Sequence, residues 1–180
     1  MSLSEAILVC LTEGPQTGYD IAKTFQTSIG FFWHADHQRI YRELKKLDEA
    51  GFVEVELVMQ TARPNKKVYS LTCAGEERLK EWSREMSAPP SIKDDMLVKL
   101  YALDKVDVAA MKRQIAARRD EHAERFAFYE KIEERRFANV DPTDIKKLGM
   151  HLGLQLGKEY DGGWVDWCNR ALKLLDKAET

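Results

Sequence analysis

The sequence predicts a mainly α-helical chain with a small β-hairpin, built as a winged helix-turn-helix domain followed by a helical dimerisation domain. Two observations predict this fold class. The stretch from His34 to Leu71 has the pattern of a basic-faced helix followed by two short strands. Beyond a proline-containing linker at 87–91, apolar residues recur only at helical spacing. We therefore expect a DNA-binding domain over 1–86 and a helical dimerisation and effector domain over 92–180.

Two short helices are expected at the start of the chain. Ser4 is a suitable N-cap for the first helix, and Gly14-Pro15 ends it. Thr17 or Gly18 opens the second. The apolar residues expected to face inward from these two helices are Ile7, Leu8, Leu11, Ile21, Ala22 and Phe25.

The third expected helix carries apolar residues on one side and basic residues on the other. Ile40, Leu44 and Leu47 recur at spacings of four and three, which makes one apolar face. Gly51 stands where a helix in this register ends, at the left-handed cap position. The polar and basic residues on the other side are Gln38, Arg39, Arg42, Lys45 and Lys46. Such a helix suits the major groove of DNA.

A wing is expected directly after this helix. Val53, Val55 and Leu57 alternate with glutamates, which is the period-two pattern of a half-buried strand. A second short strand is expected over Val68–Leu71. The turn between them has a basic tip, made of Arg63, Asn65, Lys66 and Lys67. This tip is placed to lie along the phosphate backbone.

Helices account for the rest of the chain. Thr72 is a good N-cap for a fourth helix with Leu79, Trp82 and Met86 on one stripe. A short helix follows around Met96 and Leu100, and Asp107 can cap a long one. The apolar stripe of this long helix comprises Met111, Ile115, His122, Phe126, Tyr129 and Ile132. Asp141-Pro142 is expected to start the last helix, with a weak point at Gly162-Gly163.

The charge balance limits the kinds of partner. The chain has 180 residues, 28 basic and 30 acidic, and a formal net charge of −2. A nonspecific coat on nucleic acid is therefore unexpected, and contact with DNA must come from a local basic patch. The three scattered cysteines suit a reducing cytoplasm. We expect no membrane span, because the apolar segment 148–157 is far shorter than the roughly 20 residues that spanning requires.

The last helix predicts a dimer. Gly149, Gly153 and Gly157 recur at every fourth residue among leucines. A glycine inside a helix costs roughly 1 kcal/mol relative to alanine, so the close approach of a second helix is expected to offset the cost. The residues expected at this interface are Phe126, Leu148, Gly149, Leu152, Gly153, Leu156, Gly157, Trp164 and Trp167. The aromatic residues of this helix have an alternative role, as the wall of a pocket for a flat hydrophobic or aromatic effector. They are Trp164, Trp167 and Tyr160.

The sequence shows no catalytic constellation. It lacks the nucleophile elbow, the phosphate loop, the dinucleotide glycine motif and the zinc-protease motif, so we expect no enzyme activity and no cofactor. His34 and His37 stand three residues apart, but no third and fourth metal ligand follows at the spacing of known metal sites. We therefore expect no metal site. At the start of a DNA-reading helix, His37 is expected to meet phosphates or bases instead. A docking module for another protein is the alternative function.

Several short motifs recur together along the chain. They are Gly18-Tyr19-Asp20-Ile21, Gln38–Leu44, Gly51-Phe52-Val53, Lys67–Thr72, Asp95–Leu100 and the tryptophans of the last helix. With these motifs the chain resembles the PadR family of transcriptional regulators, in the branch with a larger helical C-terminal domain like that of the virulence activator AphA. The resemblance implies a homodimeric regulator, usually a repressor, that binds an inverted-repeat operator and is often released by an effector. It also implies that Tyr19 and Tyr41 lie against DNA. The wing has lysine where the family more often has arginine, so we expect phosphate contact there more than base reading.

Overall fold

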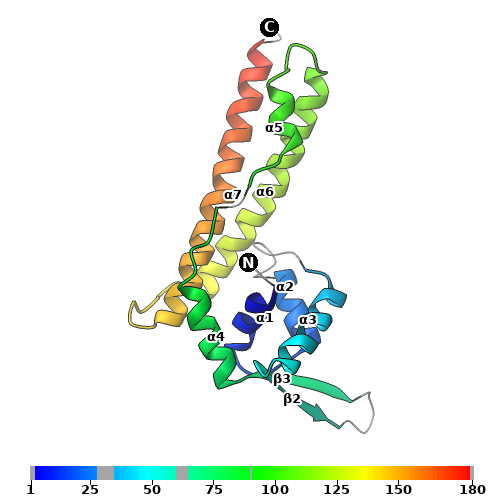
Figure 1. Ribbon diagram of the computed structural model, residues 1–180. Coiled ribbons are helices and arrows are strands. Elements are labelled where there is room, and N and C mark those ends of the chain that lie inside the picture. The colour runs from blue at the N-terminus through cyan, green and yellow to red at the C-terminus, as the bar shows by residue number, and fades with distance from the viewer. Residues whose placement is uncertain (1–2, 28–34, 60–64, 90, 179–180) are drawn as a thin grey trace. The chain divides into compact units, whose positions relative to one another are not determined.

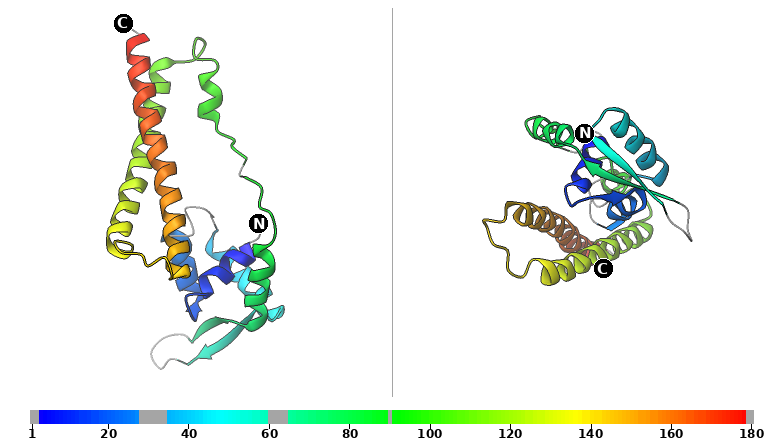
Figure 2. Two further views of the ribbon diagram at one scale, coloured as in Figure 1. Left: turned by 90° about the vertical axis from the view of Figure 1, so that its left-hand side faces the viewer. Right: turned by 90° about the horizontal axis from the view of Figure 1, so that it is seen from below.

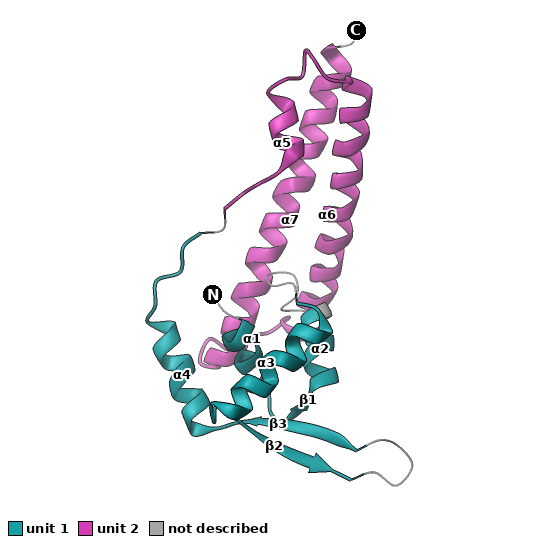
Figure 3. Cartoon of the chain, turned by 45° about the vertical axis from the view of Figure 1, so that its right-hand side comes forward, with its two compact units in different colours: residues 1–90 teal, residues 91–180 magenta. Residues whose placement is uncertain are grey.

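The computed structural model describes residues 3–27, 35–59, 65–89 and 91–178, and the chain divides into two compact units (Figures 1 and 3). Unit 1 comprises residues 1–90 and unit 2 comprises residues 91–180. The sequence placed a linker at 87–91, around this division. The expected fold class is confirmed, because helices dominate and the strands form one small antiparallel sheet.

Unit 1 contains four helices and three strands among its described residues. In chain order they are α1 (Leu3–Leu11), β1 (Gln16–Thr17), α2 (Gly18–Thr27), α3 (His37–Glu49), β2 (Val53–Val58), β3 (Lys66–Leu71) and α4 (Cys73–Ser83). The buried core of the unit takes in all the inward-facing residues that the sequence predicted for the first three helices. Ile7, Leu8, Ile21, Ile40 and Leu44 are fully buried there.

The sheet has one strand more than the sequence indicated. The strand order is β1-β3-β2, and Tyr69 of β3 is paired with Gln16 on one side and Val55 on the other. β1 has only two residues, which is too short to show an alternating pattern. This pairing ties the residues just before α2 to the base of the wing.

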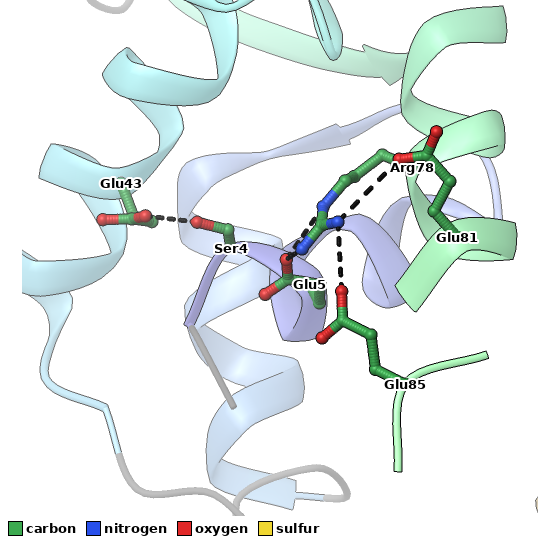
Figure 4. Close-up of polar contacts among 6 residues, drawn as sticks. All are labelled: Ser4, Glu5, Glu43, Arg78, Glu81 and Glu85. Atoms are coloured by element: carbon green, nitrogen blue, oxygen red, sulfur yellow. Dashed lines mark hydrogen bonds and ion pairs between the residues drawn. The ribbon is translucent and has the colours of Figure 1, made fainter. Parts of the chain in front are cut away.

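The start of the first helix differs from expectation. α1 already includes Leu3 and Ser4, so Ser4 is not its N-cap. The Ser4 hydroxyl instead donates a hydrogen bond to the carboxylate of Glu43 on α3. Arg78 of α4 donates to the buried carboxylate of Glu5 at 2.6 Å. These two contacts join α1 to α3 and to α4 (Figure 4).

Unit 2 is helical throughout its described elements. It contains α5 (Asp95–Leu100), α6 (Val108–Arg136) and α7 (Ile145–Ala178), and α6 and α7 run side by side in opposite directions (Figure 2). Its core joins Met96, Met111, Ile115, Cys168 and Leu175, with Trp164 and Trp167 packed against it. No helix among the described residues has the length and apolar content needed to cross a membrane.

The start of the last helix corrects the sequence prediction. α7 begins at Ile145, where the carboxylate of Asp144 accepts a hydrogen bond from the Lys147 amide at 2.9 Å. Asp141 instead accepts from the amide and hydroxyl of Thr143, so it closes a turn before the helix. Gly162-Gly163 does not interrupt α7.

Candidate DNA-binding surface

α3 presents its polar face to solvent in a fixed orientation, because its apolar side is buried in the core of unit 1. Asp36 caps the helix, and its carboxylate accepts a hydrogen bond from the Arg39 amide at 2.7 Å. Gly51, with a φ of 72°, follows the C-terminus in the left-handed conformation. Ile40 and Leu44 are fully buried between these ends. The helix therefore cannot rotate about its axis without exposing them.

The exposed face of α3 carries every residue that the sequence assigned to it. His37, Gln38, Arg39, Tyr41, Arg42, Lys45 and Lys46 are all exposed. Lys46 lies 3.0 Å from the carboxylate of Glu43, and Lys45 lies 3.6 Å from that of Glu49. Within the described part of the chain, no ion pair occupies Arg39 or Arg42. These two guanidinium groups are the least neutralised charges on the helix.

The wing brings further basic residues beside this helix. Lys66 and Lys67 open β3, opposite Val58 and Leu57 of β2, and both lysines are exposed. Asn65 directly before them is also exposed. Arg63 lies outside the described residues.

An open groove of about 1180 Å³ joins the start of α2, the flank of α3 and the wing. It is lined by Thr17, Gly18, Tyr19, Asp20, Tyr41, Lys45, Asp48, Asn65, Lys66, Lys67 and Tyr69. Six of the residues that the sequence assigned to DNA thus meet in one hollow. The remaining described ones lie on the adjoining exposed face of α3.

Two exposed tyrosines flank this groove. The Tyr19 side chain is 64% exposed and that of Tyr41 is 47% exposed. Both are large apolar groups with a hydroxyl, which can pack on a sugar and donate to a phosphate. The ring of Tyr41 lies over Gly18, where an added Cβ would stand 2.5 Å from its Cε1 atom.

The carboxylates in the groove were not foreseen. Asp20 accepts a hydrogen bond from the Thr17 hydroxyl at 2.6 Å, and this bond, followed by smaller effects including the charge of Lys66, lowers the pKa of Asp20. Asp20 is therefore held charged while it fixes the start of α2. Asp48 stands seven residues after Tyr41, and this spacing on one helix face could have revealed it.

The structure gives no support for a metal at this surface. His37 is exposed, and His34 lies outside the described residues. No three metal-binding side chains come together in the part of the chain that the structure describes.

The residues expected at a dimer interface fall into two groups. Gly157, Phe126, Trp164 and Trp167 pack within their own chain. An added Cβ at Gly157 would meet the Tyr129 ring at 3.2 Å, and Trp164 stacks on His122 at 5.0 Å. The glycine ladder is therefore not one strip facing a second chain, because α7 turns Gly157 toward α6.

The second group faces outward from unit 2. Leu152 and Leu156 are 56% and 64% exposed, and an added Cβ at Gly149 or Gly153 would have no atom within 4 Å. Leu148 is half-buried. The outward side of α7 is thus an apolar strip that these two leucines and two glycines share.

Comparisons with known proteins agree over both units. Residues 7–81 match the family model of the PadR-like transcriptional regulators, and residues 92–176 match the C-terminal domain of virulence activator alpha. The chain is 35% identical to the probable transcriptional regulator Rv1176c of Mycobacterium tuberculosis, over 98% of this chain and 99% of the relative. It is 32% identical to the negative transcriptional regulator PadR of Bacillus subtilis, over 97% and 98%.

Solved structures give the same result. The Bacillus subtilis PadR structure in complex with operator DNA has a TM-score of 0.83 at 28% identity, and it covers 96% of this chain and 98% of its own. The same protein in complex with p-coumaric acid has a TM-score of 0.76 at 28% identity, over 97% and 98%. The Vibrio cholerae virulence activator AphA has a TM-score of 0.77 at 33% identity, over 98% and 99%. The chain belongs to the PadR family of transcriptional regulators, in the branch whose C-terminal domain is like that of AphA.

Proposed function

We propose that this regulator binds an inverted-repeat DNA operator as a homodimer and acts as a repressor in the cytoplasm. The observation that carries the proposal is the groove where Tyr19, Tyr41, Lys45, Lys66 and Lys67 converge. It joins a helix with a polar exposed face to a basic wing. The solved complex of Bacillus subtilis PadR with operator DNA supports this assignment, because the two folds agree along nearly the whole chain.

α3 is the element proposed to enter the major groove. Its exposed side offers Gln38, Arg39 and Arg42, which have the hydrogen-bonding groups that read base edges or hold phosphates. The wing lysines would hold the backbone beside it as point charges. Because the chain carries a net charge of −2, this local patch supplies the attraction to DNA.

The homodimer is proposed to form through the outward side of α7. Leu152, Leu156 and Tyr160 are all more than half exposed and recur at spacings of four. Such an apolar strip on a long helix is unfavourable in water, and a second copy of the same helix would cover it. A dimer would present two copies of α3 to half-sites about one helical turn apart.

A small aromatic effector is the last part of the proposal. Bacillus subtilis PadR has been solved with p-coumaric acid, which supports an effector of this class. The aromatic side chains of unit 2, including Trp164 and Trp167, are the groups that such a molecule would contact. Since Trp164 and Trp167 partly line the core of the unit, a ligand against them would also alter the α6–α7 packing.

Selection of bound duplexes from a random DNA pool tests this function. The proposal expects the full-length protein to enrich one inverted-repeat sequence, with half-sites about 10 base pairs apart. Enrichment of no sequence, together with no binding to any duplex at low salt, would contradict it. That result would favour a protein-docking role for the winged domain instead.

A further inference from the structure

Gly18 is a buried residue with a backbone conformation that does not require glycine. Gly14 and Gly51 are the glycines with positive φ among the described residues, and Gly18 is not one of them. It is the first residue of α2, where alanine would favour the helix. The reason for glycine at this position must therefore lie in its surroundings.

The surroundings are the ring of Tyr41. A Cβ added at Gly18 would lie 2.5 Å from Cε1, 3.0 Å from Cζ and 3.2 Å from Cδ1 of that ring. All three nearest atoms belong to Tyr41, so the missing side chain leaves space for one edge of this ring. A contact at 2.5 Å is far inside van der Waals distance, so an added methyl group must displace the ring or the helix.

Tyr41 stands where three elements meet. It comes from α3, rests on the first residue of α2, and shares the groove with Tyr69 of β3. Burial raises the pKa of the Tyr69 hydroxyl, and the nearby Tyr41 contributes to this rise. Tyr69 is also one of the two β3 residues, with Val68, that are paired with both β1 and β2. The Tyr41 ring therefore connects α3 to the start of α2, in the groove that the base of the wing also lines.

We infer that Gly18 is a positioning residue, which acts by letting the Tyr41 ring lie against the start of α2 and so fixes that ring at the edge of the DNA-binding groove. This inference rests on the proposed function. Tyr41 is 47% exposed, so an added methyl group can push the ring outward without unfolding the core. DNA affinity is then lost while stability is largely kept.

Gly75 supplies a matched control in the same unit. An added Cβ there would lie 2.2 Å from the backbone oxygen of Phe52, away from the groove. Backbone cannot move aside as a half-exposed ring can, so Gly75→Ala should lower the melting temperature. Any loss of DNA affinity that it causes should not depend on Tyr41.

The test is a double-mutant cycle of Gly18→Ala and Tyr41→Ala in the full-length protein, with the duplex selected by the wild-type protein as probe. Each single change should weaken binding about three- to tenfold, the range of one lost hydrogen bond or its equivalent in packing. In the Tyr41→Ala background, Gly18→Ala should change affinity less than about twofold. Gly75→Ala should have the same effect in both backgrounds.

Two results would overturn the inference while leaving the proposed function intact. One is a Gly18→Ala protein that binds the duplex as tightly as the wild type. The other is a loss of equal size in both backgrounds, which would mean that Gly18 acts without Tyr41. A crystal structure of Gly18→Ala checks the contact without DNA, since the inference requires a displaced Tyr41 ring. A wild-type protein that binds no duplex contradicts the proposed function, and the inference with it.

Discussion

At the residue scale, the side chains that we propose to face DNA differ in whether a neighbouring carboxylate neutralises their charge. Lys46 lies beside Glu43, whose pKa is lowered chiefly by the Ser4 hydroxyl and also by Lys46 itself. Glu43 thus stays ionised, and its negative charge partly neutralises the positive charge of Lys46. Arg39 and Arg42 have no such neighbour among the described residues. The arginines should therefore contribute at least as much to DNA affinity as the lysine.

We predict that Arg39→Ala, Arg42→Ala and Lys46→Ala each weaken DNA binding. For each variant, the loss of affinity should be about the same whatever the sequence of the DNA. Removing one phosphate contact should reduce the slope of log affinity against log salt by about one unit. Fluorescence anisotropy at several salt concentrations measures both quantities. Lys80→Ala on α4 is the control, because this exposed lysine lies outside the groove. Three single variants with wild-type affinity and slope would refute the assignment.

A second residue-scale prediction concerns the acid stability of unit 2. The Arg118 guanidinium donates to Asp94 at 2.6 Å and lowers the pKa of that carboxyl below its ordinary 3.8. Because the folded-state pKa is depressed, the contact stabilises the fold above about pH 4 and is lost as the pH falls through the folded value. Asp94→Asn should cost about 1 kcal/mol at neutral pH.

Urea unfolding of wild type and Asp94→Asn at pH 7 and at pH 3 measures this difference. The two proteins should differ at pH 7 and converge at the lower pH, where the wild-type carboxyl is progressively protonated. A difference that persists unchanged at pH 3 would show that the charge of Asp94 is not what stabilises the contact.

At the element scale, the wing and the last helix have separable roles. The wing attaches to the core through Tyr69 and Val53, which are buried, whereas its lysines are exposed. α7 uses its inward side to pack against α6 and carries an apolar strip on its outward side. Each element can therefore be altered on one side without disturbing the other.

For the wing, we predict that Lys66→Glu with Lys67→Glu strongly reduces DNA affinity and leaves thermal stability nearly unchanged. Surface substitutions of this kind usually stay within about 0.5 kcal/mol. The control is Lys66→Arg with Lys67→Arg, which retains both charges. Normal DNA binding by the glutamate variant would show that the wing does not touch DNA.

For α7, we predict opposite outcomes at two glycines of the same ladder. Gly157→Leu should destabilise the chain by about 1–3 kcal/mol, because its side chain would overpack against Tyr129. Gly153→Leu has open space on its own chain, so it should leave the folded subunit intact and weaken the dimer. Thermal unfolding and sedimentation separate the two effects. An unchanged dimer in the Gly153 variant would place the interface elsewhere.

At the scale of the whole molecule, periodic patterns in the sequence predicted the fold class. Features that depend on a single contact leave no such pattern and were not predicted. Ile40, Leu44 and Leu47 fixed the register of α3 because burial imposes a repeat that the sequence must follow. β1 left no such repeat. Asp141 and Asp144 are both suitable residues to start a helix, and spacing alone does not choose between them. The glycine ladder could not reveal that Gly157 faces Tyr129 of the same chain, because spacing alone does not say which helix comes close.

The sequence likewise predicted some features of the candidate site and missed others. Spacing and charge predicted that the basic face of α3 and the wing lysines would be exposed beside each other. Spacing and charge could not predict the contact of Gly18 with Tyr41, since these two residues are distant in sequence and meet only in the folded unit. The assignment of these side chains to DNA stays a prediction.

The salt dependence of binding to the selected duplex is the measurement that tests DNA binding by α3 and the wing most directly. If these elements hold phosphates on two half-sites, log affinity should fall linearly with log salt, with a slope of several units in the wild type. The variant with Lys66→Glu and Lys67→Glu should show a clearly shallower slope. An affinity that does not change with salt, or no binding even at low salt, would contradict the account.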